Sequence, residues 1–455
     1  MRWFEMVGRR VPRWASLALL MGWMLVPGEI PASAKFRTLL ILPFQPVALE
    51  PGEQWMGEGV AQSLTHAFAQ HPAFITVDRS RIRRLGSPEL WGEPAVLYAA
   101  RSLKADVALF GEIHRSAGEL TVRPRYLEVR SGGGEAHGLE PKVIPGGGLV
   151  EALPGLSLAY FRSLKVALTE GETAKVTKAA KPTASPRAFE TFVRGQLAAF
   201  RGTQEGNEAA ADLIARAVEM DPGFALAQYS LGKVHLALGN RWKAAAQFRA
   251  SIQLDPAFPE PYKSLGDLFV SNPRRLFDQA IEAYQKAVEL RPYYAEAYVG
   301  LGDARAAKGD TDGAVAQYKK ALAHNPANPR VHLSLGKIYY AEKGLYYEAV
   351  ASYKKAIELD PQFVDAMMGL GEVYEEKGLY REAIGEYQGV VEIDPKHTGA
   401  LYNLALVFEK VDPKEAIVHW ERYITIASQL PSEKDWVDVA RQHLKKLRGQ
   451  LEKGQ

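Results

Sequence analysis

The chain has 455 residues, of which 47% are apolar and 24% are charged, so wholesale disorder is excluded. The formal net charge is +3, and residues 1–34 contribute +2 of it through four arginines and two glutamates. The remaining chain is therefore nearly neutral and has no general electrostatic attraction for nucleic acid. The absence of cysteine excludes disulfides, zinc–thiolate sites and cysteine nucleophiles.

The first 34 residues have the pattern of a secretory signal peptide. Arginines precede an almost wholly apolar run from Trp14 to Val26, and Ala32-Ser33-Ala34 follows as a small-residue cleavage site. The apolar run is short for a bilayer span, which needs about 20 residues. We expect cleavage after Ala34 and export to the periplasm or cell envelope; an uncleaved N-terminal anchor is the alternative.

Residues 35–168 alternate between strand-like and helix-like segments. Strands are expected at 36–44, 74–78, 105–113 and 120–129, with a further edge strand within 131–148. Helices are expected at 58–68, 95–103 and 149–168. This order predicts an α/β domain with a mixed sheet covered by helices. The glycine tract at 132–138 lacks the features of a phosphate-binding loop and is interpreted as a flexible hairpin tip.

Several short motifs of this domain are similar to those of the TolB amino-terminal-like family, which is related to FlgO and CsgG. The similar motifs are Ile41-Leu42-Pro43-Phe44, Gly57 to Leu64, Ile75 to Ser80, Ala99 to Asp106 and Leu109 to Ile113. The resemblance covers about one hundred residues. It implies a domain that binds partners in envelope assemblies and does not catalyse a reaction.

Residues 169–187 are rich in Ala, Lys, Thr and Pro and contain one large apolar residue, Val176. Such a segment buries too little apolar surface to offset the entropy lost on ordering. We therefore expect a flexible linker between two domains.

Internal periodicity dominates the second half of the chain. Prolines recur 34 to 36 residues apart, at positions 222, 256, 292, 326, 361 and 395. Upstream of each proline from Pro256 onward stand a Leu-Gly pair, an alanine and an aromatic residue at fixed offsets, as in Leu301-Gly302, Ala314 and Tyr318, whereas the unit ahead of Pro222 lacks the Leu-Gly pair. This pattern resembles the tetratricopeptide repeat (TPR), which is a pair of antiparallel helices that must stack on its neighbours.

The expected architecture is thus a multidomain chain in which an N-terminal α/β domain precedes an all-α TPR superhelical solenoid. The solenoid spans 188–430 with about seven repeats, and the units at its edges depart from the pattern. Residues 431–455 are interpreted as a C-terminal capping helix whose apolar face consists of Val437, Ala440, Leu444, Leu447 and Leu451. A basic docking helix for a partner or a membrane is the alternative interpretation.

The resemblance implies a concave face lined by the first helix of each repeat. Counting from the Leu-Gly pairs gives a candidate partner-binding groove with the following residues: Tyr229, Lys233, Lys263, Asp267, Asp303, Lys337, Tyr340, Glu372, Glu375 and Tyr402. For any one of these residues, a solvated helix face is the simpler interpretation. The set as a whole is the best candidate for a protein or peptide groove.

No sequence pattern of a known catalytic, nucleotide or metal site is present, and no cofactor is expected. The sequence therefore predicts a non-enzymatic exported scaffold or adaptor that mediates protein–protein interactions in the cell envelope. Two alternatives stay open, an oligomeric structural component of a secretion or surface assembly and a carrier of a small ligand or glycan.

Overall fold

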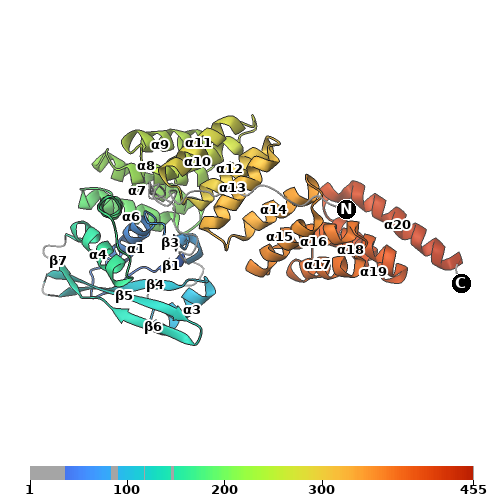
Figure 1. Cartoon of the computed structure of the whole chain (residues 1–455), viewed down its shortest axis with the longest axis horizontal. Coiled ribbons are helices and arrows are strands. Elements are labelled where there is room, and N and C mark those ends of the chain that lie inside the picture. The colour runs from blue at the N-terminus through green and yellow to red at the C-terminus, as the bar shows by residue number, and fades with distance from the viewer. Residues whose placement is uncertain (1–35, 83–90, 117, 145–147, 454–455) are drawn as a thin grey trace, which may run out of the picture. The chain divides into compact units, whose positions relative to one another are not determined.

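The computed structural model describes residues 36–453 except 83–90, 117 and 145–147 (Figure 1). The predicted leader lies outside the described residues. The described chain forms a mixed sheet region followed by consecutive helices, which confirms the predicted fold class. None of the helices among these residues is both long and apolar enough to cross a membrane.

The sheet follows the order β3-β1-β4-β5-β6, with β1 parallel to β3 and β4, and β5 antiparallel to its neighbours; β2 pairs with β4 and β7 with β5. The strands are β1 (Arg37–Ile41), β2 (Gln45–Val47), β3 (Phe74–Thr76), β4 (Val107–Ser116), β5 (Glu119–Arg130), β6 (Gly133–Gly138) and β7 (Lys142–Ile144). The glycine tract interpreted as a hairpin tip lies mostly in β6, because its backbone groups pair with β5.

The first four helices cover both faces of this sheet. They are α1 (Trp55–Phe68), α2 (Arg79–Ile82), α3 (Glu93–Ser102) and α4 (Leu149–Ser163). One face packs its buried Leu40, Ala108 and Phe110 against α3. The other face buries Leu39 and Ile41 beneath α1 and α4.

Residues 170–180 form helix α5 (Glu170–Ala180), so the predicted flexible linker is wrong for this segment. A capping box starts the helix: Thr169 accepts a hydrogen bond from the Glu172 amide, and the Glu172 carboxylate accepts one from the Thr169 amide. Val176 and Ala180 are fully buried against α1 and α4. The burial of these two side chains and the capping box stabilise a helix in a segment whose composition alone suggested a flexible linker.

The apolar core on the α1 side of the sheet continues without a break into the repeats. It joins side chains of β1 and α1 to Val176, to Phe189 of α6 (Pro186–Ala199), to Ile214 of α7 (Gln204–Met220) and to Leu231 of α8 (Ala225–Ala237). Residues 36–455 accordingly form one compact unit. In Figure 1, α1, α4 and α6 lie between the sheet and the following repeat helices.

The remaining helices form the antiparallel pairs of the solenoid, with α6 and α7 as the first pair and α8 as the start of the second. The others are α9 (Arg241–Leu254), α10 (Pro259–Val270), α11 (Phe277–Leu290), α12 (Ala295–Ala307), α13 (Thr311–His324), α14 (Pro329–Ala341), α15 (Tyr346–Leu359), α16 (Val364–Glu376), α17 (Tyr380–Ile393), α18 (Thr398–Val411) and α19 (Pro413–Ala427).

The last helix, α20 (Lys434–Lys453), packs on α19. It buries Val437, Ala440 and Leu447, and Leu444 is half-buried, so these four residues of the predicted apolar face lie against the last repeat. The basic side chains Lys445 and Lys446 are exposed.

Glycine and tyrosine repeat together because one tyrosine ring lies against two glycines. A Cβ on Gly266 would lie 2.6 Å from the Tyr284 ring, and a Cβ on Gly300 of the next repeat would lie 2.4 Å from it. Tyr353 lies in the same way between Gly336 and Gly369. The aromatic ring of each such second helix thus fills the space that the missing side chains leave.

We predict that Gly336→Ala destabilises the chain by about 1–3 kcal/mol, because its methyl group would force the Tyr353 ring out of its site. The matched control is Gly385→Ala in α17, where no atom lies within 4 Å of the added methyl group. That substitution should stabilise the chain by about 0.5–1 kcal/mol. Urea unfolding measures both, and equal effects of the two substitutions would contradict the packing described.

We also predict that Val176→Asp lowers the free energy of unfolding by about 3–5 kcal/mol, because it places an unpaired carboxylate in the shared core. Lys175→Asp, at the neighbouring exposed position of α5, is the control. Urea unfolding followed by circular dichroism compares the two variants. If residues 169–187 were a tether, both variants would unfold like the native chain.

Candidate functional site

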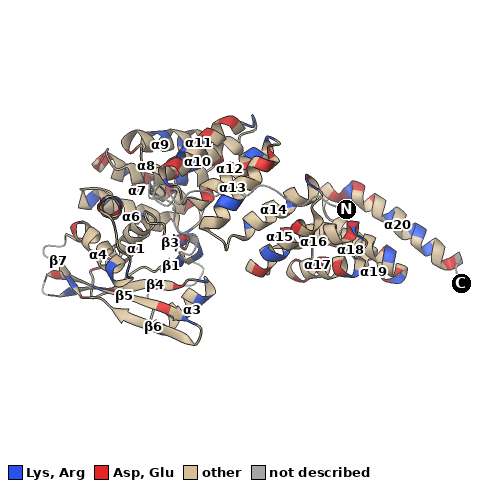
Figure 2. Cartoon of the chain, viewed as in Figure 1, with Lys and Arg blue, Asp and Glu red and all other residues tan. Residues whose placement is uncertain are grey.

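The residue directly after each Leu-Gly pair lies on the first helix of its repeat, and together these residues form a stripe. From α8 to α16 it consists of Lys233, Asp267, Asp303, Lys337 and Glu372. Charges of both signs occur along the repeat helices in Figure 2. These five positions belong to the groove that the sequence predicts, and the structure distinguishes them by the contacts they already make.

Two carboxylates of the stripe are occupied by tyrosines of their own repeats. Tyr284 donates a hydrogen bond to Asp267 at 2.7 Å, and Tyr318 donates one to Asp303 at 2.7 Å. Burial raises the pKa of both tyrosines, and burial also raises the pKa of Asp303. These carboxylates therefore fasten the second helix of a repeat to the first.

Their remaining oxygens are also used within the solenoid. Asp267 forms an ion pair with Lys263 at 2.7 Å, one turn earlier on α10. Asp303 forms an ion pair with Arg330 of the next repeat at 3.1 Å. Lys263, Asp267 and Asp303 thus already have ion-pair partners within the solenoid before any other protein binds.

The N-terminal end of the stripe lies close to the α/β domain. The Lys233 ammonium lies 5.9 Å from the centre of the Tyr229 ring, and the charges of Tyr229 and of Asp78 both help to raise the lysine pKa. Arg79 of α2 stacks over Phe200 at the end of α6. The chain's own first domain therefore borders this part of the predicted groove.

Three tyrosines of the predicted set are packed against other aromatic residues. Tyr229 contacts Phe258 at the start of the next repeat, with ring centres 5.3 Å apart. Tyr340 contacts Tyr346 and donates a hydrogen bond to Glu376. Tyr402 contacts rings of both α19 and α20, with Trp436 at 5.5 Å. These contacts give each tyrosine a packing role between helices, and ligand stacking by any of them stays a prediction.

Lys337 and Glu372 differ from Asp267 and Asp303. Both side chains are exposed, and neither forms a hydrogen bond or ion pair with the described residues. Glu375, one turn along α16 from Glu372, accepts a hydrogen bond from Tyr387 at 3.1 Å. Within the part of the chain described, Lys337 on α14 and Glu372 on α16 thus offer opposite charges without a hydrogen-bond or ion-pair partner on adjacent repeats. Lys233 also lacks such a partner among the described residues, but its ammonium lies by the Tyr229 ring and its pKa is influenced by Asp78 of the α/β domain.

Two carboxyl groups on α16, Glu372 and Glu375, have raised pKa values. Partial loss of hydration at its carboxyl group raises the pKa of Glu372, with a further contribution from the charge of Glu375 and an opposing one from Lys337. Burial likewise raises the pKa of Glu375. A cationic group of a partner placed beside Glu372 would relieve this repulsion.

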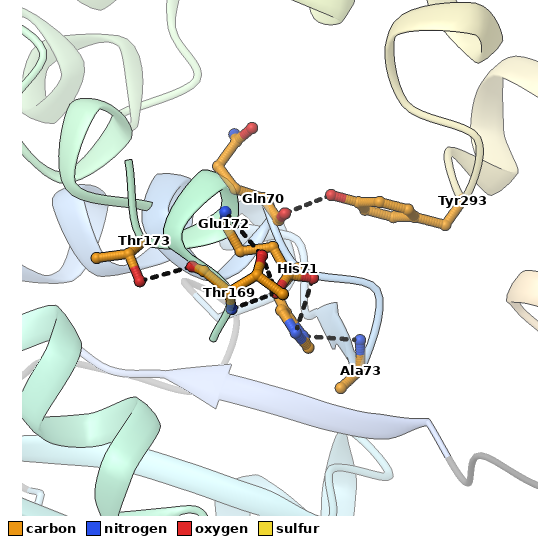
Figure 3. Close-up of polar contacts among 7 residues, drawn as sticks. All are labelled: Gln70, His71, Ala73, Thr169, Glu172, Thr173 and Tyr293. Carbon is orange, nitrogen blue, oxygen red and sulfur yellow. Dashed lines mark hydrogen bonds and ion pairs between the residues drawn. The ribbon is translucent and has the colours of Figure 1, made fainter. Parts of the chain in front are cut away.

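A set of polar contacts closes the junction between α1, α5 and the repeats (Figure 3). Tyr293, in the loop before α12, donates a hydrogen bond to the Gln70 carbonyl at the end of α1. His71 accepts a hydrogen bond from the Ala73 amide at 3.2 Å, and its Nε2 lies 3.6 Å from the Glu172 carboxylate. Burial lowers the pKa of His71. Sequence reasoning missed this junction because its residues come from three distant segments.

Further along the solenoid, two more contacts join the sheet domain to the repeats. The ring of Phe36 meets that of His324 at the end of α13, with centres 6.4 Å apart. Lys104 donates a hydrogen bond to the Leu359 carbonyl at 2.7 Å. Among the described residues, no group of three His, Asp or Glu side chains is placed to hold a metal ion.

We predict a pH effect at Glu372. A carboxyl group whose pKa is raised in the folded chain binds its proton more readily folded than unfolded, so its contribution to stability falls as pH rises above the ordinary pKa near 4.5. Glu372→Gln should therefore gain stability relative to the native chain between pH 4 and pH 7. Urea unfolding at both values measures this, with Glu392→Gln at an exposed position of α17 as the control. A larger gain at pH 4 than at pH 7 would contradict it.

Comparison with known proteins supports the repeat assignment. Models described as TPR repeat match residues 277–309, 302–342 and 340–378, and models described as tetratricopeptide repeat match 201–259 and 364–397. The chain is 32% identical over 122 residues to small glutamine-rich tetratricopeptide repeat-containing protein 2 of Mycosarcoma maydis, which covers 27% of this chain and 34% of that protein.

It is also 32% identical over 111 residues to protein O-mannosyl-transferase TMTC1 of Homo sapiens, covering 23% of this chain and 12% of that protein. The chain thus matches about a third or less of the length of these two relatives. Among solved structures, YrrB, described as a TPR protein with an unusual peptide-binding site, is 24% identical with a TM-score of 0.36, covering 44% of this chain and 99% of that one. Residues 201–259 and 277–397 are therefore tetratricopeptide repeats, a class of repeat that mediates protein–protein interactions.

Proposed function

We propose that this protein is an exported, non-enzymatic scaffold or adaptor of the cell envelope. In this proposal the concave face of the repeats around α14 and α16 binds a segment of a partner protein. The α/β domain, which shares its apolar core with the first repeats, binds a second component. The partner-binding surface is the part of the predicted groove that the chain does not use for its own packing.

The observation that carries the proposal is the free pair Lys337 and Glu372. Every other charged member of the stripe is engaged by a tyrosine or an ion pair of the repeats, or borders the α/β domain. Exposed opposite charges on adjacent repeats suit an extended segment that presents a carboxylate to Lys337 and a basic group to Glu372. Such electrostatic complementarity fixes the register of a partner more than its overall affinity.

The export part of the proposal depends on the signal-peptide pattern of residues 1–34. The proposed role of the first domain depends on its resemblance to the TolB amino-terminal-like family. The order of strands and helices in residues 36–163 is compatible with that resemblance. A non-enzymatic role agrees with the engagement of Asp267, Asp303 and Glu375 in packing, since these carboxylates accept hydrogen bonds from buried tyrosines.

The direct test is retention of partner proteins from envelope extract by residues 35–455, compared with the charge-swapped variant Lys337→Glu/Glu372→Lys. The swap keeps the net charge and the exposure of both positions. The matched control is Lys319→Glu/Glu392→Lys, which swaps exposed charges on the second helices α13 and α17. Each variant is first checked by circular dichroism.

We expect a defined protein that the native chain and the control retain and that the groove variant loses by tenfold or more, since the swap replaces two favourable charge contacts with repulsion. Retention of the same proteins by both variants would move the binding surface away from α14 and α16. Loss in both variants would show that retention depends on the general distribution of surface charge and not on this groove.

A further inference from the structure

A cavity of about 590 Å³ lies where the α/β domain, α5 and the repeats meet. Its walls come from three places: the end of α1 with His66 and Gln70, the outward side of α5, and the three successive loops that join α7 to α8, α9 to α10 and α11 to α12. This volume lies within the range of sites for small organic ligands. The cavity is separate from Lys337 and Glu372, which do not line it.

The floor of the cavity is apolar. Leu226, Leu254, Phe258 and Leu290 line it, together with alanines and prolines of the inter-repeat loops. The His66 ring lies 6.0 Å from the Phe258 ring, and burial lowers the pKa of this histidine, which favours its neutral form. An apolar part of a ligand would therefore meet hydrocarbon and neutral rings on this side.

Basic side chains of α5 form the rim. Lys175 and Lys178 lie one turn apart on α5 and Lys181 follows at its end, so that all three border the cavity. Lys175 forms no hydrogen bond or ion pair with the described residues, and Lys181 forms one ion pair, with Glu151 at 3.5 Å. A ligand can thus meet one unpaired ammonium group and a second one that a single ion pair holds.

The carboxylates at the cavity are already satisfied by the protein. Asp221 accepts hydrogen bonds from Thr183 and from the Gly223 amide, and Asp255 accepts them from Lys178 at 2.7 Å and from the Ala257 amide. Arg291, which is 6% exposed, is neutralised by Glu260 at 2.8 Å. Among the lining residues, Lys175 and Lys181 then remain against the single negative charge of Asp221, so the remaining charge is positive and comes from the lysines of α5 and its end.

We propose that this cavity binds an amphipathic anion, that is, a small molecule with an apolar body and a carboxylate, sulfonate or phosphate group. The apolar body lies on the leucines and Phe258, and the anionic group lies between Lys175 and Lys181. Because the walls belong both to the α/β domain and to the repeats, the ligand holds the two together at the same junction as Tyr293 and Gln70. No part of this proposal depends on the partner that the groove binds.

The test uses 1-anilinonaphthalene-8-sulfonate, a fluorescent amphipathic anion, titrated against residues 35–455. Two variants address the two halves of the site: Lys175→Glu/Lys181→Glu reverses the rim, and Ala257→Trp fills the cavity from an exposed loop position. The control is Lys243→Glu/Lys319→Glu, which makes the same change of net charge on α9 and α13 outside the cavity. Thermal unfolding by circular dichroism establishes that every variant is folded.

We expect one tightest dye site per chain, weakened at least tenfold by each cavity variant and unchanged in the control, since one charge-assisted contact typically contributes about a factor of ten. Octanoate should displace the dye, whereas octylammonium, with the same apolar body and the opposite charge, should not. Equal dye affinity in the native chain and either cavity variant would overturn the proposal. Equal displacement by the two octyl compounds would also overturn it, because the site would then be apolar without a preference for anions.

Discussion

The continuous apolar core from the β-sheet to the second repeat is the constraint on which the other features depend. Side chains of β1, α1 and α4 pack on α5 and α6, and these pack in turn on α7 and α8. The sheet domain is therefore an extension of the solenoid and not a separate body on a tether. Its position determines that α1 and α2 border the first repeats, where Asp78 and Arg79 reach Lys233 and Phe200.

Within the repeats, the tyrosine of a second helix has two structural roles. The tyrosine of a second helix fills the space beside two glycines, and its hydroxyl group reaches a carboxylate on the first helix, as Tyr284 does for Gly266, Gly300 and Asp267. A buried hydroxyl group needs such a partner. Carboxylates that look like ligands in the sequence are consequently part of the scaffold. Among the described residues, Lys337 and Glu372 are not reached by such a hydroxyl group, and, unlike Lys233, they are not seen to border the α/β domain; these two positions are the ones left for a partner.

The repeats could be predicted from the sequence because their physical requirement recurs every 34 to 36 residues, and periodicity averages out the ambiguity of any single residue. Most strands and helices of the first domain also follow from local apolar patterns. Helix α5 could not be predicted in this way, because only Val176 among its residues is large and apolar. The capping box formed by Thr169 and Glu172 was the one local signal that favoured a helix.

The groove was predictable as a set of positions but not as a set of free side chains. Whether Asp303 is available depends on Tyr318 and Arg330, which lie 15 and 27 residues away and meet it only in the folded repeat. The junction cavity was beyond sequence analysis for the same reason, since α1, α5 and three loops contribute to it and no motif links them.

Hydrogen exchange of the backbone amides of α5 shows whether the sheet and the repeats share one core. If α5 belongs to the shared core, its amides from Thr173 to Ala180 should exchange with protection comparable to those of α1 and α6, because opening α5 would require separating the sheet from the repeats. Exchange of α5 at the rate of an unstructured peptide, beside protected α1 and α6, would contradict the claim and restore a tether between two independent domains.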